Sequence, residues 1–340
     1  MQIKFWGVRG SLPAPGPTSL FRNKVSRILM AAQGLSLDDN LKINEFLDIL
    51  PPHLTHLVGG NTSCVEVVSG RSHLILDAGS GLRNLGLRIS GREPLSPEGD
   101  PFMDLSRGRP GRKAAWPNPK APELTFLLSH THWDHLQGLP FFIPAFMPGA
   151  SLTFYGQDKA WLEEALRHQQ RAPRMFPVAL KDLAAKLTFC DFPQGELRLG
   201  DLVITSFPLP HPGGCLAYRI RQGRRSLVYA TDYEFQDPDS RQAAEFAAFA
   251  RGADLFISDT QYTHLESIAR EGWGHSSSIV ALSLARRAKA RAFFLFHHDP
   301  EHNDAKLFDN LEKTRAYYHT LEGRPDMRIE LAIEGLTVQI

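Results

Sequence analysis

Cysteine is scarce in this chain, and the few cysteines lie far apart. Among 340 residues only Cys64, Cys190 and Cys215 occur, and no two of them form a Cys-x-x-Cys motif. An odd and scattered set argues against a disulfide framework and favours a reducing compartment. We therefore expect these thiols to be small residues of the core.

Long apolar runs are also missing. No uninterrupted apolar stretch approaches the roughly 20 residues that a membrane-spanning helix needs. The N-terminal segment, residues 2–7, reads as a first strand and lacks the charged and apolar regions of a secretory signal. These absences predict a cytoplasmic protein without a membrane partner.

Neither sign of charge is in excess. The chain has 38 basic and 37 acidic side chains, which gives a formal net charge of +1. Without a global positive field, the surface as a whole does not attract a large RNA or an anionic membrane, so any contact with nucleic acid has to be local. With 42% hydrophobic residues, the chain is long enough to bury a substantial core.

The most informative stretch follows an apolar run at residues 124–128, which predicts a buried strand. Directly after it, His130, His132, Asp134 and His135 fall within six positions. His130 and His132 are two apart, so both imidazoles project from the same side of an extended segment. The other two lie where the backbone would turn into a helix. Imidazole and carboxylate ligands suit zinc and other first-row divalent ions. A polar, solvated loop is the alternative, but it explains few of these features.

The pattern His130-x-His132-x-Asp134-His135 resembles the signature of the metallo-β-lactamase superfamily of hydrolases. The resemblance implies three further ligands at later strand ends, and His211, Asp232 and His297 stand in such places. His297 is chosen over the adjacent His298, which would then point elsewhere or toward substrate. The implied site has two divalent ions, with zinc first and manganese or iron also suited. One ion would be held by His130, His132 and His211, the other by Asp134, His135 and His297, and Asp232 would bridge them.

Two further residues gain roles from the same resemblance. Gly274-His275-Ser276-Ser277 is similar to the catalytic-histidine motif of ribonuclease Z and its phosphodiesterase relatives. There the histidine protonates the leaving oxygen or holds the phosphate, unless His275 merely sits in a helix-capping loop. Asp134 would also orient the nucleophile. Asp77, at a strand end, either hydrogen-bonds the first ligand histidine or caps the next helix.

The expected fold is α/β, a four-layer αβ/βα sandwich with the metals at one edge between two sheets. It is predicted as a single domain, residues 1–340, with two insertions. Residues 14–58 predict a helical hairpin, either docked on the body or acting as a lid or dimer contact. Residues 91–122 form an irregular, Pro/Gly-rich and locally basic stretch, which either contacts phosphate groups or faces water.

Three details of the helices and strands are also predicted. In the first insertion, Thr18 or Ser19 would cap a helix with Phe21, Val25, Ile28 and Leu29 on one face, and Ser36 would cap a second helix. Residues 159–171 predict an amphipathic helix with Trp161 turned inward. A final hairpin is expected from residues 328–333 and 336–340.

The leading functional prediction is a phosphodiesterase acting on a small nucleotide, including a cyclic nucleotide. A ribonuclease Z-like endonuclease that processes RNA 3′ ends is the alternative, although the neutral net charge does not favour RNA. Thioester or lactam hydrolysis stays open because a metal pair does not choose phosphorus over carbon. A metal-binding sensor that has lost catalysis is a further alternative. A homodimer is implied by the resemblance alone.

Overall fold

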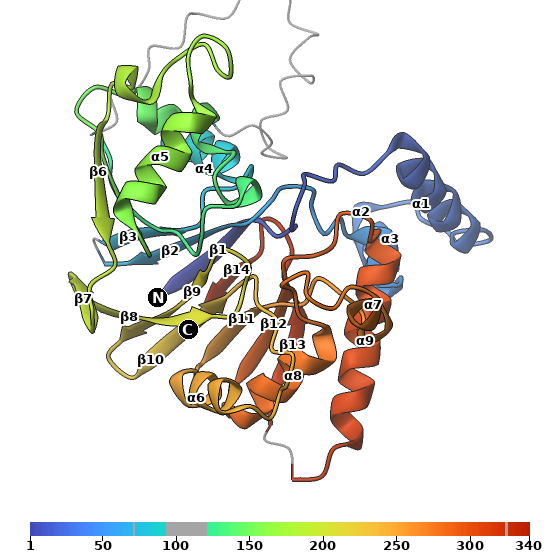
Figure 1. Cartoon of the computed structure of the whole chain (residues 1–340). Helices are drawn as coiled ribbons and strands as arrows, with labels where there is room; N and C mark the ends of the chain where they lie inside the picture. The colour runs from blue at the N-terminus through green and yellow to red at the C-terminus, as the bar shows by residue number, and fades with distance from the viewer. Residues whose placement is uncertain (71, 93–120, 324–325) are drawn as a thin grey trace, which may run out of the picture.

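A computed structural model describes residues 1–70, 72–92, 121–323 and 326–340. Its centre is a pair of facing seven-stranded sheets (Figure 1). The first has the order β14 (Thr337–Gln339), β1 (Gln2–Gly7), β2 (Cys64–Ser69), β3 (Ser72–Leu76), β4 (Glu123–Leu127), β5 (Ser151–Gly156) and β6 (Lys186–Asp191). The second has the order β13 (Arg328–Leu331), β12 (Ala292–Phe296), β11 (Leu255–Asp259), β10 (Arg225–Ala230), β9 (Cys215–Gln222), β8 (Leu202–Leu209) and β7 (Glu196–Leu199).

Helices cover the outer faces of both sheets (Figure 1). On the first sheet these are α4 (Leu82–Ile89) and α5 (Lys159–Gln169), and on the second they are α6 (Arg241–Phe249), α8 (Ser278–Arg287) and α9 (Asp304–Thr320). The predicted four-layer sandwich is therefore confirmed.

The core between the sheets follows from the strand patterns. In β1 buried and half-buried residues alternate, because one face of the strand packs on the opposite sheet. In β11 and β12 every residue is buried, since helices cover their second face. Phe5 of β1 and Phe294 of β12 stack across the interface with ring centroids 5.8 Å apart. This pair is one of many buried contacts through which the two sheets pack against each other.

Strand direction gathers the functional residues at one edge. β3, β4 and β5 are parallel neighbours in the first sheet, and β10, β11 and β12 are parallel neighbours in the second. The carboxyl ends of parallel strands meet at the same edge, which is where open α/β sheets place their sites.

The predicted final hairpin is wrong. β13 pairs in parallel with β12 in the second sheet, whereas β14 pairs antiparallel with β1 in the first. The turn between them is held to the first sheet by a hydrogen bond from Gly335 N to Phe5 O, so the chain changes sheets at this point.

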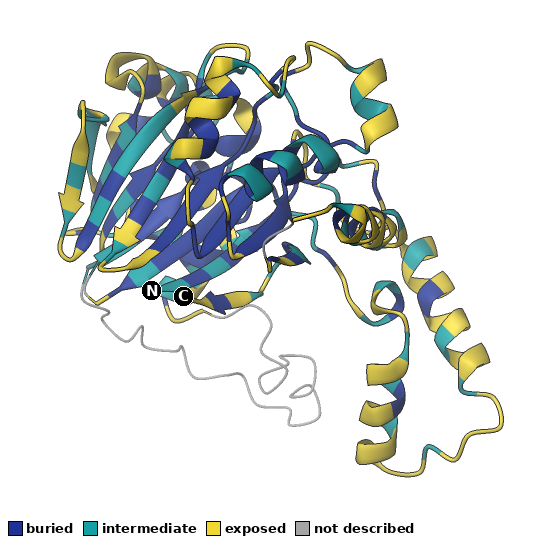
Figure 2. Cartoon of the chain, turned by 90° about the horizontal axis from the view of Figure 1, so that it is seen from below, coloured by how far each residue is buried: buried dark blue, intermediate teal, exposed yellow. Residues whose placement is uncertain are grey.

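The segment between β1 and β2 projects from the body as α1 (Thr18–Ala31), α2 (Asn40–Ile49) and a short α3 (Pro52–Thr55) (Figures 1 and 2). The predicted caps differ from the observed ones. Pro17 precedes α1 without a side-chain cap, and Asp39 rather than Ser36 caps α2 by accepting from the backbone N–H of Lys42.

The apolar face predicted for α1 is exposed. Phe21, Val25 and Leu29 are in contact with solvent, and the buried residue of the helix is Lys24. Its Nζ lies 2.6 Å from Asp304 Oδ2 of α9, and this buried ion pair attaches the polar side of α1 to the body. Among the described residues no helix is long and apolar enough to cross a membrane.

Candidate metal centre

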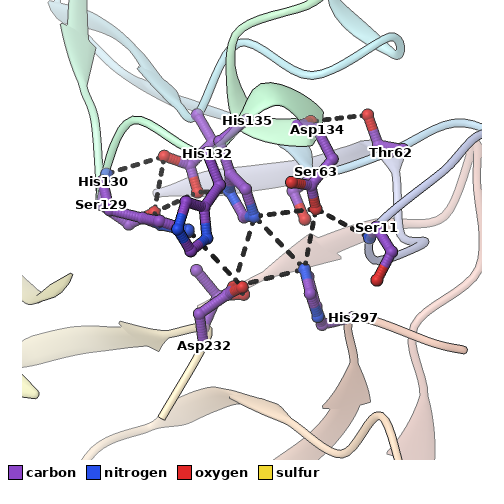
Figure 3. A network of polar contacts seen from close by, with 12 residues as sticks. Ser11, Thr62, Ser63, Ser129, His130, His132, Asp134, His135, Asp232 and His297 are labelled. Atoms are coloured by element: carbon purple, nitrogen blue, oxygen red, sulfur yellow. Dashed lines mark hydrogen bonds and ion pairs between the residues drawn. The ribbon is translucent and has the colours of Figure 1, made fainter. Parts of the chain in front are cut away.

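Four separate segments bring the predicted ligands together, and Figure 3 labels six of the seven, all except His211. His130 and His132 follow β4, and Asp134 and His135 lie in the 3₁₀ turn Trp133–His135 that comes next. His211 lies between β8 and β9, Asp232 follows β10, and His297 follows β12. All seven side chains meet between the two sheets, at the edge where β4, β10 and β12 end.

The first group of ligand atoms comes from His130, His132 and His211, which lie within 4.8 Å of one another. His132 Nδ1 is 3.1 Å from His211 Nε2. His130 is buried, His211 is half-buried and His132 is exposed, so this group opens toward solvent.

The second group, Asp134, His135, Asp232 and His297, is entirely buried. His135 Nε2 lies 3.2 Å from His297 Nε2 and 3.1 Å from Asp134 Oδ2. His297 Nε2 is 3.3 Å from Asp134 Oδ2.

Asp232 is a member of the second group and also faces the first. Its Oδ1 lies 3.7 Å from His130 Nε2, and its Oδ2 lies 3.3 Å from both His135 Nε2 and His297 Nε2. The two oxygens of one carboxylate thus face different groups of ligand atoms. This is the placement that a bridging ligand requires.

The spacing of these atoms suits shared metal ions. Two atoms bonded to one tetrahedral zinc at about 2.0–2.1 Å stand roughly 3.3 Å apart, close to the separations found here. Two buried ring nitrogens, His130 Nε2 and His297 Nδ1, have no hydrogen-bond partner among the described residues. His130 Nε2 is the atom directed at the cluster, and a buried polar atom without a partner is costly unless something binds it. The donor set therefore fits a pair of divalent ions.

Three histidines have their second ring nitrogen held by an acceptor. His135 Nδ1 lies 2.8 Å from Asp77 Oδ2, His211 Nδ1 lies 2.8 Å from Gly274 O, and His130 Nδ1 lies 3.0 Å from Ser129 Oγ. With Nδ1 donating in each case, Nε2 carries the lone pair toward the cluster. These acceptors therefore favour the tautomer whose Nε2 can bind a metal ion.

Asp77 is the centre of this outer layer. Its carboxylate accepts hydrogen bonds from the backbone N–H and hydroxyl of Ser129 and from Tyr229 Oη at 2.7 Å. The sequence predicted a bond to the first ligand histidine, but Asp77 bonds His135 and reaches His130 only through Ser129. It does not cap α4, whose N-cap is Gly81.

Several strands end in a left-handed residue as they enter the site. Asp77, Asp232 and His297 have φ of 59°, 55° and 60°, and Ser11 has φ of 60°. This conformation is uncommon for residues other than glycine and persists where the surroundings over-determine it. Ser11 also donates its backbone N–H to Asp134 Oδ2 at 2.8 Å, which fixes that carboxylate.

Burial determines the protonation of the first group. It holds the pKa of His130 well below the ordinary value, and the neighbouring His135 adds to the shift. Burial likewise lowers the pKa of His132 and of His211. Neutral imidazole is the form that binds metal.

In the second group, charge outweighs burial. Burial alone would raise the pKa of Asp134 and of Asp232, but the facing histidines, His135 among them, hold both pKa values well below the ordinary range. The same carboxylates raise the pKa of His135 against the effect of its own burial. A proton and a metal ion therefore compete for this ring.

His275 lies beside these two groups, and with Asp259 and His297 it forms a third group of side chains whose ligand atoms lie within 4.8 Å of one another. Its ring centroid is 5.4 Å from that of His211 and 5.2 Å from that of His297. Its Nδ1 lies 2.8 Å from Asp259 Oδ2. Burial lowers the pKa of His275, but the Asp259 carboxylate outweighs this effect and raises the pKa to about 9.

Asp259 was not predicted as a site residue. Its position in the sequence could have indicated a role, because Asp259 ends a buried strand that lies between the two strands leading to Asp232 and His297.

His298 lies outside the cluster: it is buried, and its Nε2 donates to Ala332 O at 2.9 Å. The predicted basic stretch, residues 91–122, falls almost wholly outside the described residues.

A family model described as a beta-lactamase superfamily domain matches residues 100–298, more than half of the chain. The chain belongs to this superfamily. It is therefore a hydrolase of the metallo-β-lactamase fold that carries candidate ligand groups for divalent metal ions.

Individual superfamily members agree with this assignment. The chain is 28% identical over 200 residues to the probable metallo-hydrolase YhfI of Bacillus subtilis (strain 168), covering 55% of this chain and 72% of YhfI. It is 32% identical over 120 residues to a ribonuclease Z of Thermoplasma acidophilum, covering 35% and 36% of the two chains.

Solved structures share the fold. The crystal structure of YhfI has a TM-score of 0.58 at 20% identity and covers 99% of both chains. A diphosphatase of the PhnP family has a TM-score of 0.55 at 17% identity, covering 100% of this chain and 97% of that one.

Proposed function

We propose that this protein is a dinuclear metal-dependent phosphodiesterase that acts on a small nucleotide, including a cyclic nucleotide. The observation that carries the proposal is the position of Asp232 between two groups of ligand atoms. Two zinc ions are the proposed cofactors, with manganese or iron also compatible with the donor set. When bound, such a pair lowers the pKa of water and stabilises the attacking and leaving oxygens of an in-line displacement.

The protein residues supply orientation and proton transfer. In the proposed mechanism Asp134, whose carboxylate accepts from the Ser11 N–H, orients the attacking water. His275 gives a proton from Nε2 to the departing oxygen, while Asp259 holds Nδ1 and sets the ring orientation. A leaving oxygen that needs protonation is typical of phosphodiester cleavage. Such an acid is less necessary for a thioester, because a thiolate departs without a proton.

The match to a ribonuclease Z supports the same reaction class on a larger substrate. An endonuclease that processes RNA 3′ ends is therefore the second candidate. The net charge of +1 favours the small substrate. The homodimer implied by the resemblance stays a prediction.

The test is hydrolysis by metal-reconstituted protein of bis(p-nitrophenyl) phosphate, p-nitrophenyl phosphate, a thioester and a β-lactam. We expect turnover of the diester, and loss of that turnover in Asp232→Ala. Activity confined to the thioester or the lactam would refute the proposal. Cleavage of RNA 3′ ends with strong salt dependence, and none of small diesters, would favour the second candidate.

A further inference from the structure

A cavity of about 340 Å³ lies beside the first group of ligands. Three segments line it: the ligand loop with His130 and Thr131, the start of α5 with Gln157, Asp158 and Trp161, and the glycines Gly213 and Gly214 that follow His211. Its volume lies within the range of small-molecule sites, roughly 300–1,000 Å³. The metal chemistry described above uses none of these residues except His130.

Trp161 is the main aromatic wall of this cavity. The sequence pattern predicted it to turn inward on α5, but 62% of its surface is exposed. Its indole Nε1–H donates to Thr131 Oγ1 at 2.8 Å, and Thr131 lies between the ligands His130 and His132. The indole is therefore held in a fixed relation to the metal ligands, while a large apolar surface remains open to a ligand.

Another part of the lining is shaped by two glycines with left-handed backbone. Gly213 and Gly214 have φ of 86° and 82°. A Cβ on Gly214 would lie 2.6 Å from Gln157 Oε1, and a Cβ on Gly213 would lie 4.0 Å from His132 Nε2. The glycines thus let the exposed Gln157 amide, which offers both a donor and an acceptor, lie against the backbone close to the metal ligands.

We propose that this cavity binds the nucleobase of the substrate, stacked on Trp161, with the Gln157 amide at its polar edge. This inference rests on the proposed phosphodiesterase function and names the part of the substrate that gives specificity. A nucleobase is planar and aromatic with donors and acceptors along its edge, and it stacks on exposed aromatic side chains irrespective of sequence. His130 lines the cavity and also faces Asp232, so a bound nucleoside would place its phosphate at the ligands.

A second cavity, of about 460 Å³, is lined by His211 itself. It is lined by the carboxylates Glu234 and Asp237, and Glu234 accepts from the backbone N–H groups of Gly272 and Gly274. This cavity contains two carboxylates, whereas the first contains one, Asp158, which caps α5, so like-charge repulsion disfavours a phosphate more strongly at the second cavity. The exposed Trp273 lies next to Gly272 and Gly274 in the chain and supplies a matched comparison for Trp161.

The experiment measures the equilibrium binding of adenosine 5′-monophosphate and of ribose 5-phosphate to metal-loaded protein by calorimetry. The two probes share the ribose 5-phosphate group, and ribose 5-phosphate has an anomeric hydroxyl where adenosine 5′-monophosphate has its base. We expect the base to tighten binding by about 10- to 100-fold in the wild type. Trp161→Ala should bring the ratio close to one, and Trp161→Phe should keep most of it. Tyr317→Ala, an exposed aromatic on α9, is the control and should leave the ratio unchanged.

The inference would be overturned if the two probes bound the wild type with similar affinity, or if their affinity ratio were unaffected by Trp161→Ala. It would also be overturned if the ratio were lost in Trp273→Ala instead. Absence of binding of both probes at millimolar concentration would also refute it.

Hydrolysis of bis(p-nitrophenyl) phosphate is measured on the same preparations. Hydrolysis without discrimination of the base refutes the cavity proposal alone, and discrimination without any diester hydrolysis refutes the phosphodiesterase proposal. A folded Trp161→Ala protein is verified by its circular dichroism and Tm.

Discussion

His275 Nδ1 lies 2.8 Å from Asp259 Oδ2. His275 comes from the loop before α8, and Asp259 is the last residue of β11. The carboxylate fixes which ring nitrogen is free and where it points. In the proposed mechanism Asp259 is thus a positioning residue, and His275 is the group that contacts the leaving oxygen.

We expect His275→Ala to lower the turnover of diesters by about 10²- to 10⁴-fold while the metal content stays at the wild-type level. The loss should be larger for a poor alkoxide leaving group than for p-nitrophenolate, because only the former needs a proton. Asp259→Asn should cause a smaller loss with the same dependence on the leaving group. Steady-state kinetics and metal analysis measure both effects. Loss of metal in His275→Ala would show that this residue is a ligand instead.

Replacement of the bridging carboxylate should act on the metals. Removal of an outer partner of a metal ligand usually costs about 10- to 100-fold in affinity, so loss of Asp232 itself should cost at least about 100-fold. Asp232→Ala is expected to hold fewer than two ions per chain by mass spectrometry after dialysis. Asp201→Ala is the control, because that carboxylate bonds Ser69 and Gln222 away from the cluster. Equal metal content in the two variants would contradict the bridging role.

The buried hydroxyl of Tyr229 should stabilise the protein more than that of Tyr218. Tyr229 Oη donates to the Asp77 carboxylate, whereas Tyr218 Oη donates to the neutral Leu128 O. Hydrogen bonds to charged groups contribute about 1.5–3 kcal/mol, and neutral ones about 0.5–1.5 kcal/mol. Urea unfolding should therefore show a larger loss for Tyr229→Phe than for Tyr218→Phe. Equal losses would mean that Asp77 does not depend on this donor.

His298 should make the metal-free protein sensitive to acid. Burial, with the positive charge of Arg9 adding to it, lowers the pKa of His298 to about 3, whereas an unfolded histidine titrates near 6.5. Below about pH 6.5 the unfolded chain binds a proton that the folded chain does not, so the free energy of unfolding falls as pH falls toward 3. From pH 7 to pH 5, this effect of His298 lowers the free energy of unfolding by about 2 kcal/mol.

His298→Gln retains a donor for Ala332 O but does not titrate. Its urea-unfolding free energy should therefore decrease less than that of the wild type between pH 7 and pH 5. The comparison uses metal-free protein because acid also displaces metal from the neighbouring ligands. Parallel pH dependences of the two proteins would contradict the assignment.

The sequence by itself determined the fold class and the residues that form the cluster. The ligand motif lies within six positions of one loop, and each later ligand directly follows an apolar run that reads as a strand. Because parallel strands end at a common edge, residues that are distant along the chain, such as Asp232 and His297, could be expected to meet. The local pattern identified the ligand loop, and the resemblance to the superfamily implied the later ligands and the four-layer fold.

Only the tertiary structure decided which contacts each side chain makes. The apolar face of α1 is exposed because the Lys24–Asp304 ion pair docks its other side, and Trp161 lies at the surface, where its indole bonds Thr131. Asp259 acquires a function only from the position of His275, which lies in another segment. Helical periodicity shows which residues share a face, but the element that packs against a helix determines which face is buried.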